Sequence, residues 1–270
     1  MQALYPKMNK FLHISFLIAL FVASCNNYNK LLKSTNYELK LEKANHYYEK
    51  KNYVRAQQLY EELIPIFKGS DKSEEIYYRY TWTHFYIGDF SLAQIHFKNF
   101  VRQFPNSEKA EECFFMNGYC YYLNSPKYSL DQTATINAIK EMQSFIDVFP
   151  ESKYMDSANT IINILHHKLE KKEYEILKQY RMLDDYKAVI TAGINFEKDY
   201  PDSEYNEEVR YLIIESYYLL GINSIPSKKK ERLEKVGEYY LKFISLHPQS
   251  KFLKEAENYY TKSQRELNSL

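Results

Sequence analysis

Few side chains in this 270-residue chain are spaced for chemistry at a catalytic or metal centre. His166, His167 and Glu170 come within reach of one another on a predicted helix, but a zinc site takes three or four well-placed ligands. Cys113 and Cys120 are seven residues apart on one predicted helix, roughly 10 Å along its axis. That separation is too long for an unstrained disulfide. We therefore expect two free, buried cysteines and no metal site.

The rest of the chain contains no pattern typical of an enzyme. Carboxylates are frequent, but none has a neighbouring Ser, Cys or His in a nucleophile arrangement, and no glycine-rich phosphate loop is present. The basic run Lys228-Lys229-Lys230 lies beside Glu231 and Glu234, which is typical of a solvated surface. The formal net charge of +1 gives no reason to expect nucleic acid as a partner. We expect a binding protein without a cofactor.

Cys25 is the exception, because its surroundings predict lipidation. An apolar run ends in Val22-Ala23-Ser24-Cys25, and small residues before such a cysteine are typical of a bacterial lipobox. This predicts a signal peptide over residues 1–24, a lipid on Cys25, and a polar tether over residues 25–37. The alternative is an ordinary secretory signal with an incidental cysteine. No acidic residue follows Cys25 before Glu38, which favours the periplasmic face of the outer membrane.

The segment Tyr77 to Ser107 reveals the elements that carry the remaining residues. It reads as two helices joined by Gly88-Asp89-Phe90, with Thr81 and Ala93 where the two helices would touch. Small residues allow close helix packing, and a proline ends the second helix. This is the tetratricopeptide pattern, whose hairpins must stack on neighbours to bury their apolar faces.

Four copies of an aromatic or His, then Pro, a polar residue and Ser, mark the repeats. Their prolines are separated by 45, 51 and 47 residues and lie at Pro105, Pro150, Pro201 and Pro248. We predict an all-α solenoid of about five hairpins with a capping helix at the carboxy terminus. Repeats 1–3 would occupy residues 38–154, and repeats 4–5 with the cap residues 155–270. Three irregular positions stand out: a link at 124–132, Gly193 in place of an aromatic, and a loop over 223–230.

A candidate binding surface follows from the repeat geometry. Positions 2, 5, 9 and 12 of the first helix of each tetratricopeptide hairpin face the inner surface of the solenoid. In the first three repeats these positions are almost all apolar or aromatic, although a solvated surface would not require it. We predict a groove for an extended, aromatic-bearing peptide, lined by Tyr48, Tyr78, Trp82, Phe85, Phe115, Tyr119 and Tyr122. The alternative is that these rings pack internally, against the next helix or the 125–132 link.

Taken together, the lipobox at Val22–Cys25, the repeats, and the endings Phe-Pro-Asn-Ser and Tyr-Pro-Asp-Ser resemble the BamD family of outer-membrane assembly lipoproteins. The link around Pro126–Gln132 looks like that family's insertion. The resemblance implies a lipid-anchored scaffold of the β-barrel assembly machinery, on the periplasmic side of the outer membrane. It implies that the carboxy-terminal repeats bind the periplasmic domains of a BamA-type barrel protein, and that the amino-terminal repeats bind unfolded outer-membrane proteins.

Two other classes of protein share parts of this pattern. A general periplasmic tetratricopeptide adaptor for envelope synthesis would have the lipobox and the repeats, but no reason to carry the Pro126–Gln132 insertion. A glycan-binding lipoprotein would also use groove aromatics, although such proteins are usually longer and carry an acidic export signal.

Overall fold

The computed structural model describes residues 28–270, and these are helical with no β-strand among them. The signal peptide and Cys25 therefore lie outside the described residues. An all-α repeat architecture, as predicted, is confirmed. The helices are α2 (Tyr37–Glu49), α3 (Tyr53–Ile66), α4 (Ser73–Ile87), α5 (Phe90–Gln103), α6 (Ala110–Asn124), α7 (Thr133–Val148), α8 (Met155–Met182), α9 (Tyr186–Asp199), α10 (Asn206–Ile222), α11 (Pro226–Leu246) and α12 (Leu253–Asn268).

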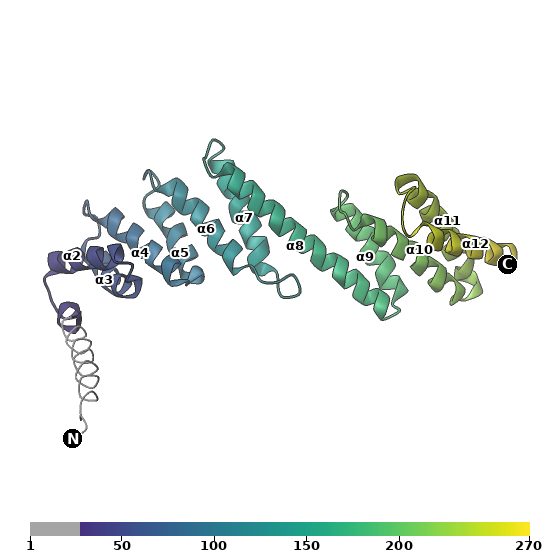
Figure 1. Cartoon of the computed structure of the whole chain (residues 1–270), viewed down its shortest axis with the longest axis horizontal. Helices are drawn as coiled ribbons and strands as arrows, with labels where there is room; N and C mark the ends of the chain where they lie inside the picture. The colour runs from purple at the N-terminus through teal and green to yellow at the C-terminus, as the bar shows by residue number, and fades with distance from the viewer. Residues whose placement is uncertain (1–27) are drawn as a thin grey trace, which may run out of the picture. The chain divides into compact units, whose positions relative to one another are not determined.

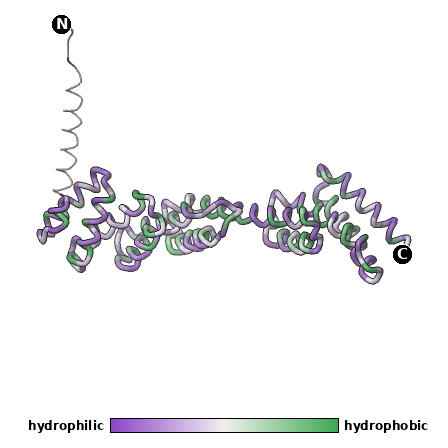
Figure 2. The backbone as a smooth tube through the Cα atoms, turned by 90° about the horizontal axis from the view of Figure 1, so that it is seen from below, coloured by the Kyte–Doolittle hydropathy of each residue, from purple (hydrophilic) through white to green (hydrophobic). Residues whose placement is uncertain are grey.

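The chain forms two compact units. The described part of the first runs to Asn124 and includes Lys140–Ala158, while the second combines Ser125–Ile139 with Asn159–Leu270. Within each unit, helices that follow one another in the sequence pack side by side (Figure 1). Hydrophobic and hydrophilic residues alternate along the helices (Figure 2). Several helices, α5 and α12 among them, are amphipathic and have one apolar face to bury. Stacked hairpins bury those faces, as a repeat architecture requires.

Three turns between paired helices use the same backbone conformation. Lys51, Gly88 and Asp184 all have positive φ, at 58°, 89° and 57°. A left-handed residue ends a helix sharply, and glycine adopts it at least cost. In two of these turns the next residue caps the following helix: Asp89 accepts a hydrogen bond from the Leu92 N–H at 3.1 Å, and Asp185 accepts one from the Ala188 N–H at 3.0 Å. Asn52, in the third turn, makes no such bond. The Gly-Asp-aromatic signature thus stands for one left-handed residue and one capping residue.

The four Pro-x-Ser endings have a shared structural role. In each, the serine Oγ accepts a hydrogen bond from the backbone N–H two residues later. In three of them the same hydroxyl also donates to a glutamate in the first turn of the hairpin's first helix. These pairs are Ser107 with Glu74 at 2.8 Å, Ser152 with Glu111 at 2.5 Å, and Ser250 with Glu207 at 2.6 Å. The serine thereby joins the two ends of a hairpin.

Gly193 is a tightly packed residue, which corrects its interpretation as a degenerate position lacking an aromatic. A Cβ atom at this position would lie 2.7 Å from Ile213 Cγ1 of α10 and 3.4 Å from Leu177 Cδ1 of α8. No side chain fits there without a shift of its neighbours. Gly118 is a milder case, because a Cβ atom there would lie 3.1 Å from Met142 Sδ. Glycine here marks the closest approach between helices.

The segment before the first repeat, predicted as a polar tether, makes ordered contacts with the first hairpin. Residues 28–32 are helical, and Tyr28, 8% exposed, donates its hydroxyl hydrogen to Gln58 Oε1 at 2.8 Å. The buried Lys40 ammonium donates to the Leu32 carbonyl at 2.7 Å and to Glu62 at 2.5 Å. One aromatic ring and one buried cation therefore fasten this segment to α2 and α3.

The predicted loop over 223–230 is shorter in the structure. Helix α11 begins at Pro226, because proline at the first helical position needs no hydrogen-bond acceptor. The three lysines are consequently helical, and Lys229 pairs with Glu266 of α12 at 2.6 Å.

The 125–132 link is an ordered loop built around Gln132, which is 6% exposed. The Gln132 amide donates to three loop carbonyls, those of Lys127, Tyr128 and Leu130, at 2.9, 3.3 and 3.0 Å. Lysines of α8 fasten the loop from outside: Lys168 donates to Ser125 Oγ and Lys172 to the Leu130 carbonyl, both at 2.6 Å.

Candidate peptide-binding surface

The seven aromatic residues predicted to line a groove all lie in the first unit. They come from α2, α4 and α6, the first helices of three hairpins, and we call them the aromatic surface: Tyr48, Tyr78, Trp82, Phe85, Phe115, Tyr119 and Tyr122. All except Phe115 are partly exposed.

Ring contacts connect most of this set into one band. The ring centroids of Tyr78 and Trp82 are 6.2 Å apart, and those of Trp82 and Phe85 are 5.3 Å apart. The band crosses from α4 to α6 where Phe85 meets Tyr119 at 6.3 Å, and continues to Tyr122 at 5.7 Å. Aromatic pairs at these separations hold one another in place. The surface is a pre-ordered aromatic platform.

Phe115 belongs to the interior. It is 7% exposed and stacks on Tyr154 at 4.7 Å, with Phe145 of α7 at 5.6 Å. Its ring also stacks against Tyr119 at 5.9 Å. Phe115 therefore packs internally, which was the alternative considered for all seven rings. It also supports the Tyr119 ring.

Tyr86 is the residue that the sequence analysis missed. It is 47% exposed, stacks on Trp82 at 5.3 Å and on Tyr53 at 4.4 Å, and lies 6.3 Å from Tyr48. It therefore joins Tyr48 of α2 to the rings of α4. The signal was present in the sequence, because Tyr86 follows Trp82 by four residues and so shares its helix face.

A pocket of ≈ 350 Å³ opens beside Tyr48 and Tyr78. Its other lining residues are Glu49, Lys51, Tyr53, Glu75 and Arg79. The Arg79 Nε donates to Glu75 at 2.5 Å, and the Arg79 guanidinium lies 5.4 Å from the Tyr48 ring centre. Burial disfavours a charged Glu75, yet hydrogen bonds from Lys109 and Arg79 hold the pKa of its carboxyl below the usual value. The pocket thus combines tyrosine walls with a charged pair.

Two polar groups of the aromatic surface differ in how they are satisfied. The Tyr78 hydroxyl donates to Glu112, and burial together with that carboxylate raises the pKa of Tyr78. The indole N–H of Trp82 is buried, and it interacts with the Tyr78 oxygen, which opposes that rise in the pKa.

The other sequence candidates give no chemical centre. His167 Nδ1 lies 3.0 Å from Glu170 Oε2, and residues 28–270 contain no cluster of three or more His, Cys, Asp or Glu arranged for a metal. Cys113 and Cys120 are free and buried, as predicted. Burial raises the pKa of Cys120 to about 12, which leaves its thiol protonated and unreactive at neutral pH.

In chemical terms, this part of the chain is equipped to bind. The aromatic surface offers flat apolar area at low entropic cost, and the adjoining pocket offers a carboxylate and a guanidinium for polar groups. Within the described residues, none of the helices is apolar over a stretch sufficient to span a bilayer.

Comparison with known proteins assigns a family. A family model described as "YfiO: Outer membrane lipoprotein" matches residues 35–235. The chain is 22% identical over 193 residues to the "Outer membrane protein assembly factor BamD" of Pasteurella multocida, covering 68% of this chain and 74% of that protein. A protein of the same name from Haemophilus influenzae is 20% identical over 227 residues, covering 80% and 87%. The one from Rickettsia prowazekii is 20% identical over 180 residues, covering 67% and 72%.

Proposed function

The chain belongs to the YfiO family of outer membrane lipoproteins, and on that premise we propose that it is a scaffold of the machinery that assembles outer-membrane β-barrel proteins. In this proposal it faces the periplasm, works by binding and catalyses no reaction. It binds the periplasmic domains of a BamA-type barrel protein through its carboxy-terminal repeats. Its amino-terminal repeats bind the targeting segments of unfolded outer-membrane proteins.

The relatives support the general role. Those compared above are named assembly factors for outer membrane proteins, and the family match at 35–235 includes every residue of the aromatic surface. Identities of 20–22% leave individual contact residues to be argued from this chain alone.

The observation that carries the substrate-binding proposal is the continuous, partly exposed band of rings from Tyr78 to Tyr122. An extended peptide would lay apolar and aromatic side chains on these rings. Its backbone amides and carbonyls would meet the Glu75–Arg79 pair in the adjoining pocket. Because the rings already pack on one another, little side-chain entropy is lost when the peptide binds.

We propose that the anchor is a lipid on Cys25. The residues before it have the length and apolar character of a signal peptide, and they end in small residues next to the cysteine. The ordered contacts of Tyr28 and Lys40 would then hold the first hairpin close to the membrane surface.

A peptide-binding assay tests the substrate role. The probe is a fluorescein-labelled 15-residue peptide from the carboxy terminus of an outer-membrane barrel protein, rich in aromatic residues. We expect Tyr86→Ala with Tyr119→Ala to weaken its binding by about tenfold, which corresponds to roughly 1–2 kcal/mol at a hot spot. Trp82 is a poorer choice, because its ring also packs on the buried Phe97 at 5.3 Å.

The matched control is Ile95→Ala, which removes a 48% exposed apolar side chain of α5 outside the aromatic surface. It should leave peptide affinity unchanged. Equal affinity of the tyrosine double variant and the wild type, with a clear loss of thermal stability, would assign these rings to internal packing. A glycan array on the same proteins would then test the glycan-binding class.

A further inference from the structure

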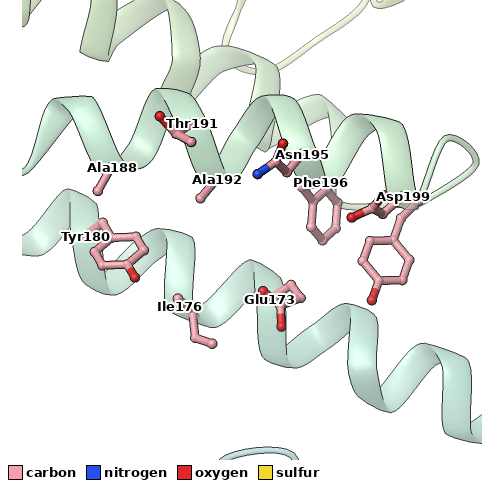
Figure 3. Close-up of a pocket in the computed structure, with 10 residues that line it drawn as sticks. Glu173, Ile176, Tyr180, Ala188, Thr191, Ala192, Asn195, Phe196 and Asp199 are labelled. Atoms are coloured by element: carbon pink, nitrogen blue, oxygen red, sulfur yellow. The ribbon is translucent and has the colours of Figure 1, made fainter. Parts of the chain in front are cut away.

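The second unit contains a groove between α8 and α9, within the carboxy-terminal repeats and outside the aromatic surface. It has a volume of ≈ 450 Å³. Glu173, Ile176 and Tyr180 line it from α8, with lining residues of α9 on the other side (Figure 3). The remaining lining residues are Ala188, Thr191, Ala192, Asn195, Phe196, Asp199 and Tyr200.

The groove is open because two residues on its α9 side are alanines. Ala188 and Ala192 lie one turn apart on the same face of α9, so they leave space in front of the helix backbone. Ile176 and Tyr180, one turn apart on α8, add apolar side-chain atoms to the lining. The lining of the groove therefore combines apolar side chains with polar and acidic ones.

The charged residues that line this groove are all acidic. Glu173 and Asp199 are exposed, and neither has an ion-pair partner among the described residues. No Lys, Arg or His lines the groove. A groove with free carboxylates and no cation of its own complements a positively charged group.

A third carboxylate adds to the same field. Glu170 lies one turn before Glu173 and is 6% exposed, and its Oε1 is buried without a hydrogen-bond partner. Burial raises the pKa of Tyr200 in the groove, and the negative charges of Glu173, Asp199 and Glu170 raise it further. The tyrosine hydroxyl therefore stays protonated and available as a donor or acceptor.

We propose that the groove between α8 and α9 binds an arginine side chain presented by a partner polypeptide. The guanidinium pairs with Glu173 and Asp199, and its planar face stacks on a tyrosine ring at the rim, Tyr180 or Tyr200. The three methylene groups lie along Ile176 and the two alanines. Arginine fits better than lysine, because only a planar guanidinium donates to two carboxylates while it stacks on an aromatic ring.

This site is separate from the aromatic surface, which lies wholly in the first unit. The peptide-binding proposal and this one therefore fail independently. Peptide binding reports on α2, α4 and α6, whereas arginine binding reports on α8 and α9.

Nuclear magnetic resonance on the mature, isotope-labelled full chain tests the proposal with two small probes. N-acetyl-arginine amide carries the charged guanidinium, and N-acetyl-citrulline amide has nearly the same shape without the charge. We expect the arginine probe to shift the backbone amide signals of Thr191 and Asn195 in a saturable manner. The citrulline probe should bind at least tenfold more weakly.

Two double variants make the test local. Glu173→Gln with Asp199→Asn should weaken arginine binding by about tenfold, since it removes two partly solvated ion pairs. Glu234→Gln with Glu257→Gln removes the same net charge from exposed positions of α11 and α12, outside the groove, and should bind the probe as the wild type does. The proposal is overturned by equal binding of the two probes, by equal weakening in both variants, or by no saturable shift at Thr191 and Asn195.

Discussion

Gly193 shows how a single missing side chain positions three helices. Side chains of α8 and α10 occupy the space that a Cβ atom at Gly193 would need. Glycine at this position therefore sets how closely α9 packs against both helices. From the sequence, glycine at 193 indicated only a departure from the repeat pattern. The requirement for it came from Ile213, a residue of the next repeat whose contact no local pattern reveals.

Two glycine substitutions separate close packing from helix propensity. Gly193→Ala should destabilise the protein by about 1–3 kcal/mol, because the new methyl group overlaps Ile213. Gly237→Ala should instead stabilise it by about 0.5–1 kcal/mol, since the nearest atom to a Cβ there is 3.5 Å away and glycine is a poor helix former. Urea unfolding of both variants measures this. Similar effects of the two changes would contradict the packing argument.

A pair of histidines in the first unit makes stability depend on pH. The rings of His84 and His96 stack at 4.8 Å, and burial lowers the pKa of both, that of His96 to about 4 with the help of His84. The unfolded chain therefore binds more protons between about pH 4 and 6.5. The stability that the neutral ring contributes is complete above about pH 6.5 and is lost as the pH falls through that window.

We expect His96→Gln to lose less stability than the wild type when the pH is lowered from 7 to 5. Urea unfolding midpoints at the two pH values measure the difference. His166→Gln changes an exposed histidine and serves as the control. Its stability should depend on pH in the same way as that of the wild type. An unchanged pH dependence in His96→Gln would show that the buried rings do not titrate as argued.

At the scale of elements, the repeat pattern predicted much of what the structure contains. The long helix α8 and the left-handed turn at Gly88 follow directly from residue spacing. The start of α11 at Pro226 was missed, because a Pro and Ser pair in a polar run is typical of both a loop and a helix start. The anchoring of residues 28–32 was missed as well, since Tyr28 and Lys40 find partners that are distant in sequence.

The 125–132 loop is an element whose order depends on one buried side chain. Gln132→Ala removes the amide that donates to three loop carbonyls and the oxygen that accepts from Thr135 at 2.7 Å. We expect a loss of about 1–3 kcal/mol, because buried polar groups are left unpaired. Hydrogen exchange at residues 127–131 should accelerate, whereas Ser129→Ala, on an exposed serine of the same loop, should change little. Unaltered exchange in Gln132→Ala would assign the order of the loop to the α8 lysines.

For the molecule as a whole, the sequence predicted the family and an aromatic surface. It predicted only some of the residues that belong to that surface. Phe115 was placed on it because of its position in the repeat. That position gives no information about Tyr154, whose ring stacks on Phe115. Tyr86 was left out because it falls outside the four inner positions. The acidic groove of the second unit was not visible in the sequence, since Glu173 and Asp199 belong to different helices and line one groove only in the folded chain.

The lipid anchor makes a prediction about location. Cys25→Ser should release the protein from the membrane into the soluble periplasmic fraction, because a serine at that position takes no lipid. Cell fractionation, with intact mass of the amino-terminal peptide, measures this. Cys120→Ser changes a buried cysteine and should stay in the membrane fraction. A Cys25→Ser protein that remained with the outer membrane would contradict the anchor.

The central claim is that this protein acts within a complex that assembles β-barrel proteins. Its most direct test is to purify the lipidated protein from membranes in mild detergent and to identify what is recovered with it by mass spectrometry. The account predicts a BamA-type barrel protein in near one-to-one amount. Recovery of envelope-synthesis enzymes without any barrel-assembly component would contradict it and would favour a general periplasmic adaptor.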